Sequence, residues 1–132
     1  MKLRFIHQRP RRRTLTAAVL LTSLLAACHD GSSPKPSGAA GRIVSPNGAE
    51  GAAVIEFAGV VSSIDVPGGV GYLSSTGGVT RAALILQQAG TIRFSLPGVP
   101  LGAGPAATVI EVADGSNQPR AVVAGYTVTY DQ

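Results

Sequence analysis

Residues able to do covalent or metal chemistry are few and unevenly placed in this chain. Cys28 is the only cysteine, and no Cys, His, Met, Trp or Lys occurs after position 41. A metal site built on Cys or His therefore lacks ligands there, and neither a Ser-His-Asp nor a Cys-His catalytic set can form. We expect no catalytic residue, no metal site and no cofactor, and the thiol of Cys28 remains the one group to explain.

Cys28 follows a segment with the layout of an export signal. Residues 1–27 hold six bases and no acid, and all the bases precede residue 15. Residues 15–27 form a run of 13 that is apolar except for two threonines and one serine. A membrane-spanning helix needs about 20 apolar residues, whereas this length is typical of a signal-peptide core. We interpret residues 1–27 as a cleaved signal peptide, with a short membrane anchor as the alternative.

Leu25, Ala26, Ala27 and Cys28 resemble the lipobox of bacterial lipoproteins. The resemblance covers residues 1–28, with a basic region, an apolar region and the box in the order of that family. It implies cleavage before Cys28, lipid transfer to its thiol, and attachment to a membrane, because two or three acyl chains hold firmly where one does not. An ordinary secretory signal with a chance cysteine is the alternative.

The residues next to Cys28 bear on the membrane that would hold the protein. Proteobacterial lipoproteins with aspartate directly after the cysteine tend to stay in the inner membrane, and here that position is His29 and the aspartate is Asp30. The resemblance therefore favours the outer membrane of a bacterial envelope, with the domain facing the periplasm or the surface. Arg12 and Arg13 fit a twin-arginine signal weakly, and we favour the general secretory route.

The rest of the chain divides into a tether and one domain. We predict that residues 28–41 are the lipidated cysteine and a flexible tether, because Gly, Ser and Pro dominate there and little can be buried. The domain then spans residues 42–132. From residue 28 onward five bases stand against seven acids, a net charge of −2, so the overall charge of +4 comes from the leader. Without a basic cluster we expect no nucleic-acid partner.

The domain alternates apolar and polar residues over short stretches between Gly and Pro turn signals, which predicts strands. These strands are expected at 53–58, 60–66, 70–74, 79–88, 91–96, 106–113 and 121–130. Residues 79–88 include good helix formers, but the Gly-containing pairs around them favour a strand. We predict an all-β fold, a small antiparallel β-sandwich of seven to eight strands that is Greek-key or jelly-roll-like. The pattern over residues 50–130 is similar to cohesin-like and carbohydrate-binding sandwich modules, and immunoglobulin-like modules fit nearly as well.

The alternation also predicts which side chains face the core. We expect Ile110 and Val112 to point inward, with Glu111 in solvent between them. Tyr126 and Tyr130 have the same parity in the predicted last strand, so they should share one face and pack against the core.

Carboxylates give two candidate sites, each with a plainer alternative. Asp114 begins an Asp-Gly-Ser-Asn stretch that resembles part of a calcium loop, but no late bidentate Glu follows, so a turn is favoured. Glu56 and Glu111 could be the carboxylate pair of a glycosidase. Nothing in the sequence places them opposite one another, so ordinary surface positions are favoured.

The apolar loop over residues 96–105 is the candidate partner contact. It carries Pro97, Val99 and Leu101 and no charged residue. Long loops are often functional, while a crossover packed over the end of the sandwich is the alternative. The chain thus predicts a non-enzymatic envelope lipoprotein, attached to the membrane through lipid on Cys28. Its sandwich would bind an envelope protein or a polysaccharide, or serve as an accessory of a secretion or surface complex.

Overall fold

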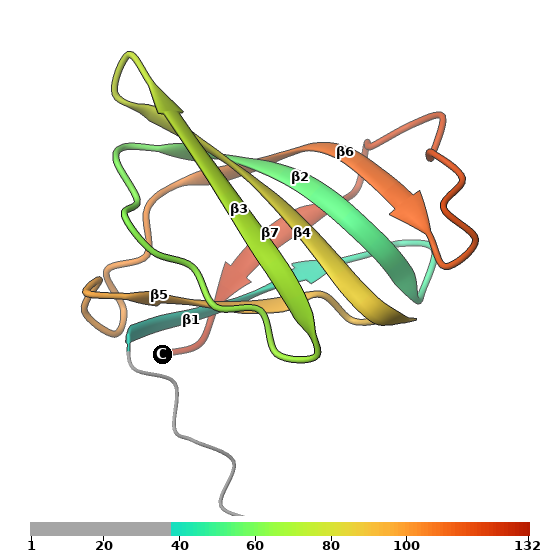
Figure 1. Ribbon diagram of the computed structural model, residues 1–132, viewed down its shortest axis with the longest axis horizontal. Helices are drawn as coiled ribbons and strands as arrows, with labels where there is room; N and C mark the ends of the chain where they lie inside the picture. The colour runs from blue at the N-terminus through green and yellow to red at the C-terminus, as the bar shows by residue number, and fades with distance from the viewer. Residues whose placement is uncertain (1–37) are drawn as a thin grey trace, which may run out of the picture. The chain divides into compact units, whose positions relative to one another are not determined.

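The computed structural model describes residues 38–132, so Leu25, Ala26, Ala27 and Cys28 lie outside the described residues (Figure 1). The described part contains seven strands and no helix, and hence no helix that could cross a membrane. The strands are β1 (Gly38–Val44), β2 (Glu50–Ala58), β3 (Gly69–Thr76), β4 (Val79–Gly90), β5 (Arg93–Pro97), β6 (Ala107–Asp114) and β7 (Thr127–Tyr130).

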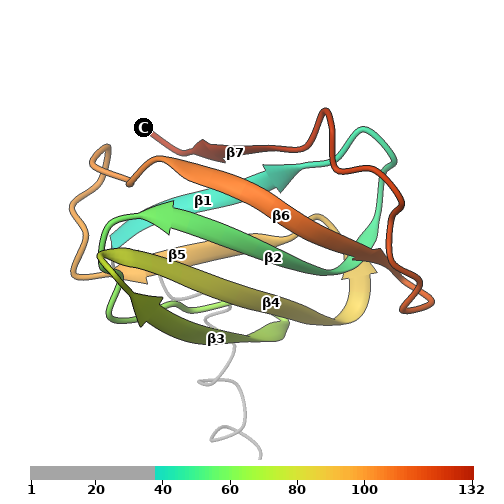
Figure 2. The same cartoon turned by 90° about the horizontal axis from the view of Figure 1, so that it is seen from above.

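Two antiparallel sheets form a β-sandwich, which confirms the predicted fold class. One sheet has four strands in the order β3-β4-β2-β6, and the other has three in the order β5-β1-β7. In Figure 2 strands β3, β4, β2 and β6 lie side by side in that order, in front of β5, β1 and β7. The chain passes between the sheets after β1, β4, β5 and β6, so most connections bridge the two layers.

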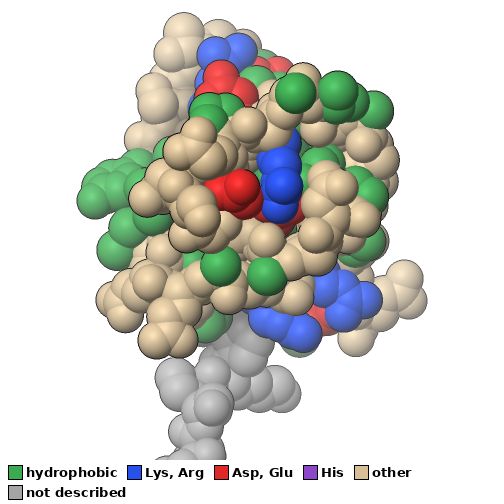
Figure 3. Space-filling view, turned by 90° about the vertical axis from the view of Figure 1, so that its right-hand side faces the viewer, with side chains coloured by type: hydrophobic (Ala, Val, Ile, Leu, Met, Phe, Trp, Pro, Cys, Tyr) green, Lys and Arg blue, Asp and Glu red, His purple; other side chains and the backbone are tan. Residues whose placement is uncertain are grey.

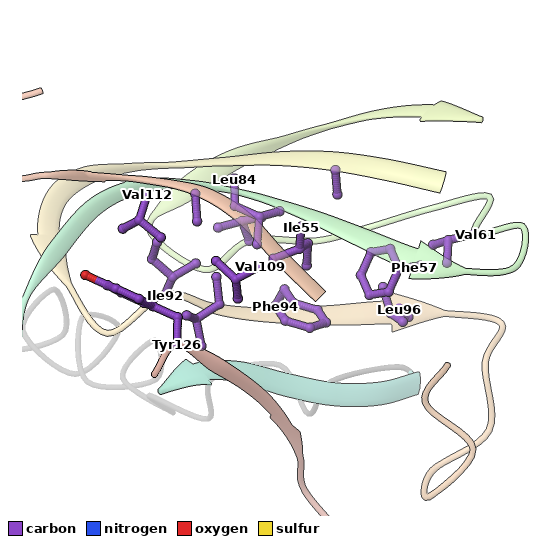
Figure 4. Packing of buried hydrophobic residues seen from close by; sticks show 14 residues of the cluster. Ile55, Phe57, Val61, Leu84, Ile92, Phe94, Leu96, Val109, Val112 and Tyr126 are labelled. Atoms are coloured by element: carbon purple, nitrogen blue, oxygen red, sulfur yellow. The ribbon is translucent and has the colours of Figure 1, made fainter. Parts of the chain in front are cut away.

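The core lies between the sheets and follows the predicted alternation. Ile55 and Phe57 of β2 and Phe94 of β5 are buried. Phe57 and Phe94 meet edge to face, with ring centroids 5.9 Å apart and an interplanar angle of 70° (Figure 4). Such a pair adds to the stabilisation that burial of the two rings gives. Side chains from both sheets thus meet in one cluster.

The first strand begins at Gly38, four residues before the predicted start of the domain, so residues 38–41 belong to the sandwich rather than to the tether. They pair with β5, and Ala39 is fully buried. A Cβ at Gly41 would lie 2.7 Å from the ring of Phe94, so only glycine fits beneath that ring. The small residues that suggested a flexible tether instead allow the strand to approach its neighbour closely.

The strand predicted over residues 60–66 is not formed, and this segment instead closes the side of the sandwich beside β5. Asp65 and Ser95 exchange two backbone hydrogen bonds of 2.9 Å each, and Val61 and Val66 are buried. The hydroxyl of Thr80 accepts a bond from the backbone N–H of Val61. A single bridge to β5 thus takes the place of the predicted strand, and the burial of Val61 and Val66 comes from packing against the core.

The orientation predicted for β6 is wrong at one position because of a β-bulge. Val54 lies opposite Glu111, but Ile55 lies opposite Val109, so Ile110 is the extra residue. Such an extra residue reverses the alternation beyond it. Val109 is buried in place of Ile110, while Glu111 is exposed as expected.

The region predicted as a last strand over residues 121–130 is a strand only at β7. Gly125 has a φ of +88°, which breaks the extended conformation just before Tyr126. By contrast, the ambiguous segment 79–88 is a strand, β4, as predicted. Gly77 and Gly78, with φ of +63° and +80°, join it to β3 in the two-residue turn typical of hairpins.

Candidate binding surfaces

The predicted contact loop is mainly a crossover between the two sheets. Pro97 pairs with β1, and Val99 packs against the core and accepts a hydrogen bond of 2.8 Å from the backbone N–H of Ala39. Leu101 is 60% exposed at the tip. Of the three residues predicted for partner contact, Leu101 is the one that presents a large exposed surface.

Two of the three tyrosines are used for packing, as expected. Tyr126 is buried, and Tyr130 meets Phe94 edge to face with centroids 6.0 Å apart. The Tyr130 hydroxyl donates a 2.8 Å hydrogen bond to the carbonyl of Pro105, and burial raises the pKa of Tyr130 to about 12. Tyr72 is 63% exposed, so the described residues present a single tyrosine rather than a row.

The candidate carboxylates occupy ordinary structural positions. The Asp114 carboxylate accepts backbone hydrogen bonds from Gln118 and Ser116, and these bonds hold its pKa below the usual value. Asp114 therefore lies in a turn, the interpretation that we favoured over a calcium loop. Glu56 forms an ion pair of 2.8 Å with Arg81 across β2 and β4. Within residues 38–132 no group of three or more His, Cys, Asp or Glu could hold a metal ion.

A buried carboxylate cluster, which we did not predict from the sequence, closes one end of the sandwich. Glu50 at the start of β2 is 2% exposed. One of its oxygens accepts hydrogen bonds from the hydroxyls of Tyr126, at 2.6 Å, and Ser45, at 2.8 Å. Its other oxygen accepts a bond of 3.1 Å from Arg120. Figure 3 shows acidic and basic side chains side by side in the middle of this end.

The electrostatics of this cluster favour the ionised form of Glu50. Burial raises its pKa, but hydrogen bonds from Tyr126, Ser45 and Arg120 and the positive charge of Arg120 together hold the pKa below its usual value. Asn47 donates a further bond of 2.9 Å to the Tyr126 hydroxyl. Because both carboxylate oxygens already have partners, the cluster has the features of a structural joint between loops rather than of a catalytic acid.

The outer face of the four-stranded sheet carries exposed apolar side chains, including Val70, Tyr72 and Ile85, on neighbouring strands. Strand pairing places its side chains in rows that run from β3 to β6. We call the two rows that begin at Val70 and at Tyr72 the outer apolar face. Its members are Val70, Ile85, Ala52 and Ala113 in one row and Tyr72, Ala83 and Val54 in the next, where Glu111 ends the row.

Two depressions adjoin this face. A groove of about 410 Å³ lies beside β6, lined by Val54, Ile85, Ile110 and Val123. A hollow of about 760 Å³ extends from Tyr72 toward Arg93 and the segment at Asp65. Both are open, so the face suits an extended contact with a macromolecule better than enclosure of a small ligand.

The fold and these surfaces define the chain's class as a small antiparallel β-sandwich that presents an apolar sheet face. Comparison with protein-family models, curated proteins and solved structures finds no match for this chain.

Proposed function

We propose that this protein is a lipid-anchored lipoprotein of a bacterial envelope whose sandwich is a non-catalytic binding module. The lipobox-like residues up to Cys28 support the anchor, with the outer membrane as the favoured site. The described domain supports the binding role, and the partner it favours is another envelope protein.

The outer apolar face is the observation that carries this proposal. Val70, Tyr72 and Ile85 are among its exposed large residues and are neighbours on β3 and β4. Exposed apolar surface of this kind is typical of protein contacts when its members are contiguous. A single exposed tyrosine gives less support to a polysaccharide ligand, since sugar recognition uses aromatic platforms. An accessory role in a secretion or surface complex would use the same face.

Site-specific photo-cross-linking of the full chain in its own envelope tests the proposal. A photoreactive residue in place of Ile85 should give a protein adduct because Ile85 lies within the outer apolar face. Val60, exposed in the segment after β2, is the matched control and should give none. Replacement of Leu101 tests the loop in the same way.

The same experiment separates the alternatives. Retention of the protein by insoluble envelope polysaccharide, lost in Tyr72→Ala, with no adduct from Ile85, would favour the polysaccharide instead. No adduct from Ile85 or Leu101 together with no retention by polysaccharide would contradict a binding role altogether.

A further inference from the structure

Strand β3 is the long uncovered edge among the described strands. The opposite edge of its sheet, β6, is bonded by the following segment, where Arg120 donates its backbone N–H to Val112 at 2.8 Å. In the other sheet, Asp65 covers β5 and β7 has only four residues. By comparison β3 has eight residues, and most of them are exposed. An edge of this kind can accept another strand.

The hairpin turn fixes which backbone groups of β3 point outward. Thr76 and Val79 close the two-residue turn as a hydrogen-bonded pair. Because such pairs alternate along an antiparallel ladder, Gly71, Leu73 and Ser75 direct their N–H and C=O groups away from β4. Within residues 38–132 no other segment donates to or accepts from these three backbones.

Strand β3 also lacks the features that usually block edge pairing. Its sequence, Gly-Val-Gly-Tyr-Leu-Ser-Ser-Thr, contains no charged residue and no proline. Its register with β4 runs without a bulge from Gly69 to Thr76. Charges, prolines and bulges are the means by which natural edge strands avoid association, so this edge is open to association.

We propose that β3 pairs antiparallel with β3 of a second copy of this chain. A twofold axis at Leu73 places Leu73 opposite itself and Gly71 opposite Ser75 of the other copy. All three outward residues of each copy then form hydrogen-bonded pairs, which no other twofold register achieves. The strand is neutral, so it meets its own copy without charge repulsion.

The pairing would join the two four-stranded sheets into one continuous sheet. On the outer side, Tyr72 of one copy would lie diagonally across the axis from Tyr72 of the other, so the two outer apolar faces approach one another there. On that face Tyr72 lies opposite Ser74 of the other copy, so a large side chain meets a small one. This proposal does not rest on the proposed function, because it holds whether or not Cys28 carries lipid.

Charge variants at the facing positions test both the dimer and its register. The full chain is purified in detergent, and light scattering measures the protein mass at about 1 to 100 µM, where moderate self-association is visible. Wild type should dimerise. Tyr72→Lys/Ser74→Lys places two like-charged pairs across the axis and should weaken the dimer about tenfold or more. Tyr72→Lys/Ser74→Glu places Lys opposite Glu twice and should restore it.

Both variants lose the Tyr72 ring, so they differ only in the charge at position 74, which faces the lysine introduced at position 72 of the other copy across the axis and Arg81 of β4 within its own copy. Thermal unfolding reports the contact with Arg81, and the protein mass reports the contact across the axis. Val60→Lys/Val122→Lys adds two charges at other exposed sites and should dimerise like wild type. Thermal unfolding of each variant shows that the fold is retained. A monomeric wild type would overturn the proposal, and so would equal behaviour of the two Tyr72 variants, whether both dimeric or both monomeric. A monomeric wild type would mean that β3 does not self-associate in this range, and equal behaviour of the two variants beside a dimeric wild type would mean that another surface or another register is used.

Discussion

Glu50 is the residue on which the end of the sandwich depends. A buried carboxylate is costly unless its oxygens are bonded, and here Tyr126, Ser45 and Arg120 supply those bonds. These partners come from the loop after β1 and from the segment before β7. Removing one of them should therefore loosen the contact between those segments and leave the buried Glu50 carboxylate with one hydrogen bond fewer.

Tyr126→Phe should lower the free energy of unfolding at pH 7 by about 1–3 kcal/mol, the usual cost of leaving a buried group without its partner. The ring is retained, so packing changes little, while Glu50 and Asn47 each lose a hydrogen-bond partner. Denaturant unfolding measures the effect, with Tyr72→Phe at the exposed tyrosine as the matched control. An unchanged stability in Tyr126→Phe would show that the cluster contributes nothing.

The same variant should alter the pH dependence of stability. The pKa of Glu50 lies below its usual 4.5, so the stabilisation it gives is present above that value and is lost as the pH falls through the folded pKa. Without the Tyr126 hydroxyl the folded pKa moves back toward the usual value. Tyr126→Phe should therefore lose less stability than wild type between neutral and acidic pH, and equal losses would contradict the assignment.

At the scale of elements, the alternation of residue types predicted most strands but not where small residues or bulges intervene. Strands β2 and β4 follow their patterns because each has one buried face. The alternation in β6 predicted the wrong orientation for Ile110, because the bulge there arises from pairing with β2 and local sequence does not show that pairing.

Two further features were hidden from sequence reasoning for physical reasons. Strand β1 was missed because its first residues are small and resemble a tether, although their smallness is what permits close packing on Phe94. The outer apolar face was missed because neighbouring side chains of different strands become adjacent only once strand order is known. The buried position of Glu50 was missed likewise, since its partners lie up to 76 residues away in sequence.

Deletion of residues 38–41 should destabilise the domain strongly, whereas deletion of residues 34–37 should not. The first deletion removes the native pairing with β5. It also shifts Lys35 to the buried position of Ala39 and Ser37 to the position of Gly41, where a Cβ would lie 2.7 Å from the Phe94 ring. Denaturant unfolding of both deletions in the full chain measures the difference. Equal stability of the two would show that the first half of β1 is dispensable, as a tether would be.

At the scale of the whole molecule, the chain combines a basic N-terminal segment, lipobox-like residues that end at Cys28 and an acidic β-sandwich. The proposed anchor and the proposed binding role of the sandwich are independent of one another and need separate experiments. The cross-linking and charge-variant experiments address the sandwich, while the lipidation that we propose at Cys28 decides whether the surfaces described above work at a membrane at all.

Metabolic labelling with palmitate tests that central claim most directly. Wild type should incorporate label and gain a mature form that begins at Cys28, as mass spectrometry of the N-terminal peptide would show. Cys28→Ser should incorporate none because it has no thiol to accept lipid, whereas Ser33→Ala, a change just beyond the box, should be labelled like wild type. Label that persists in Cys28→Ser, or a wild type that carries none, would contradict the account.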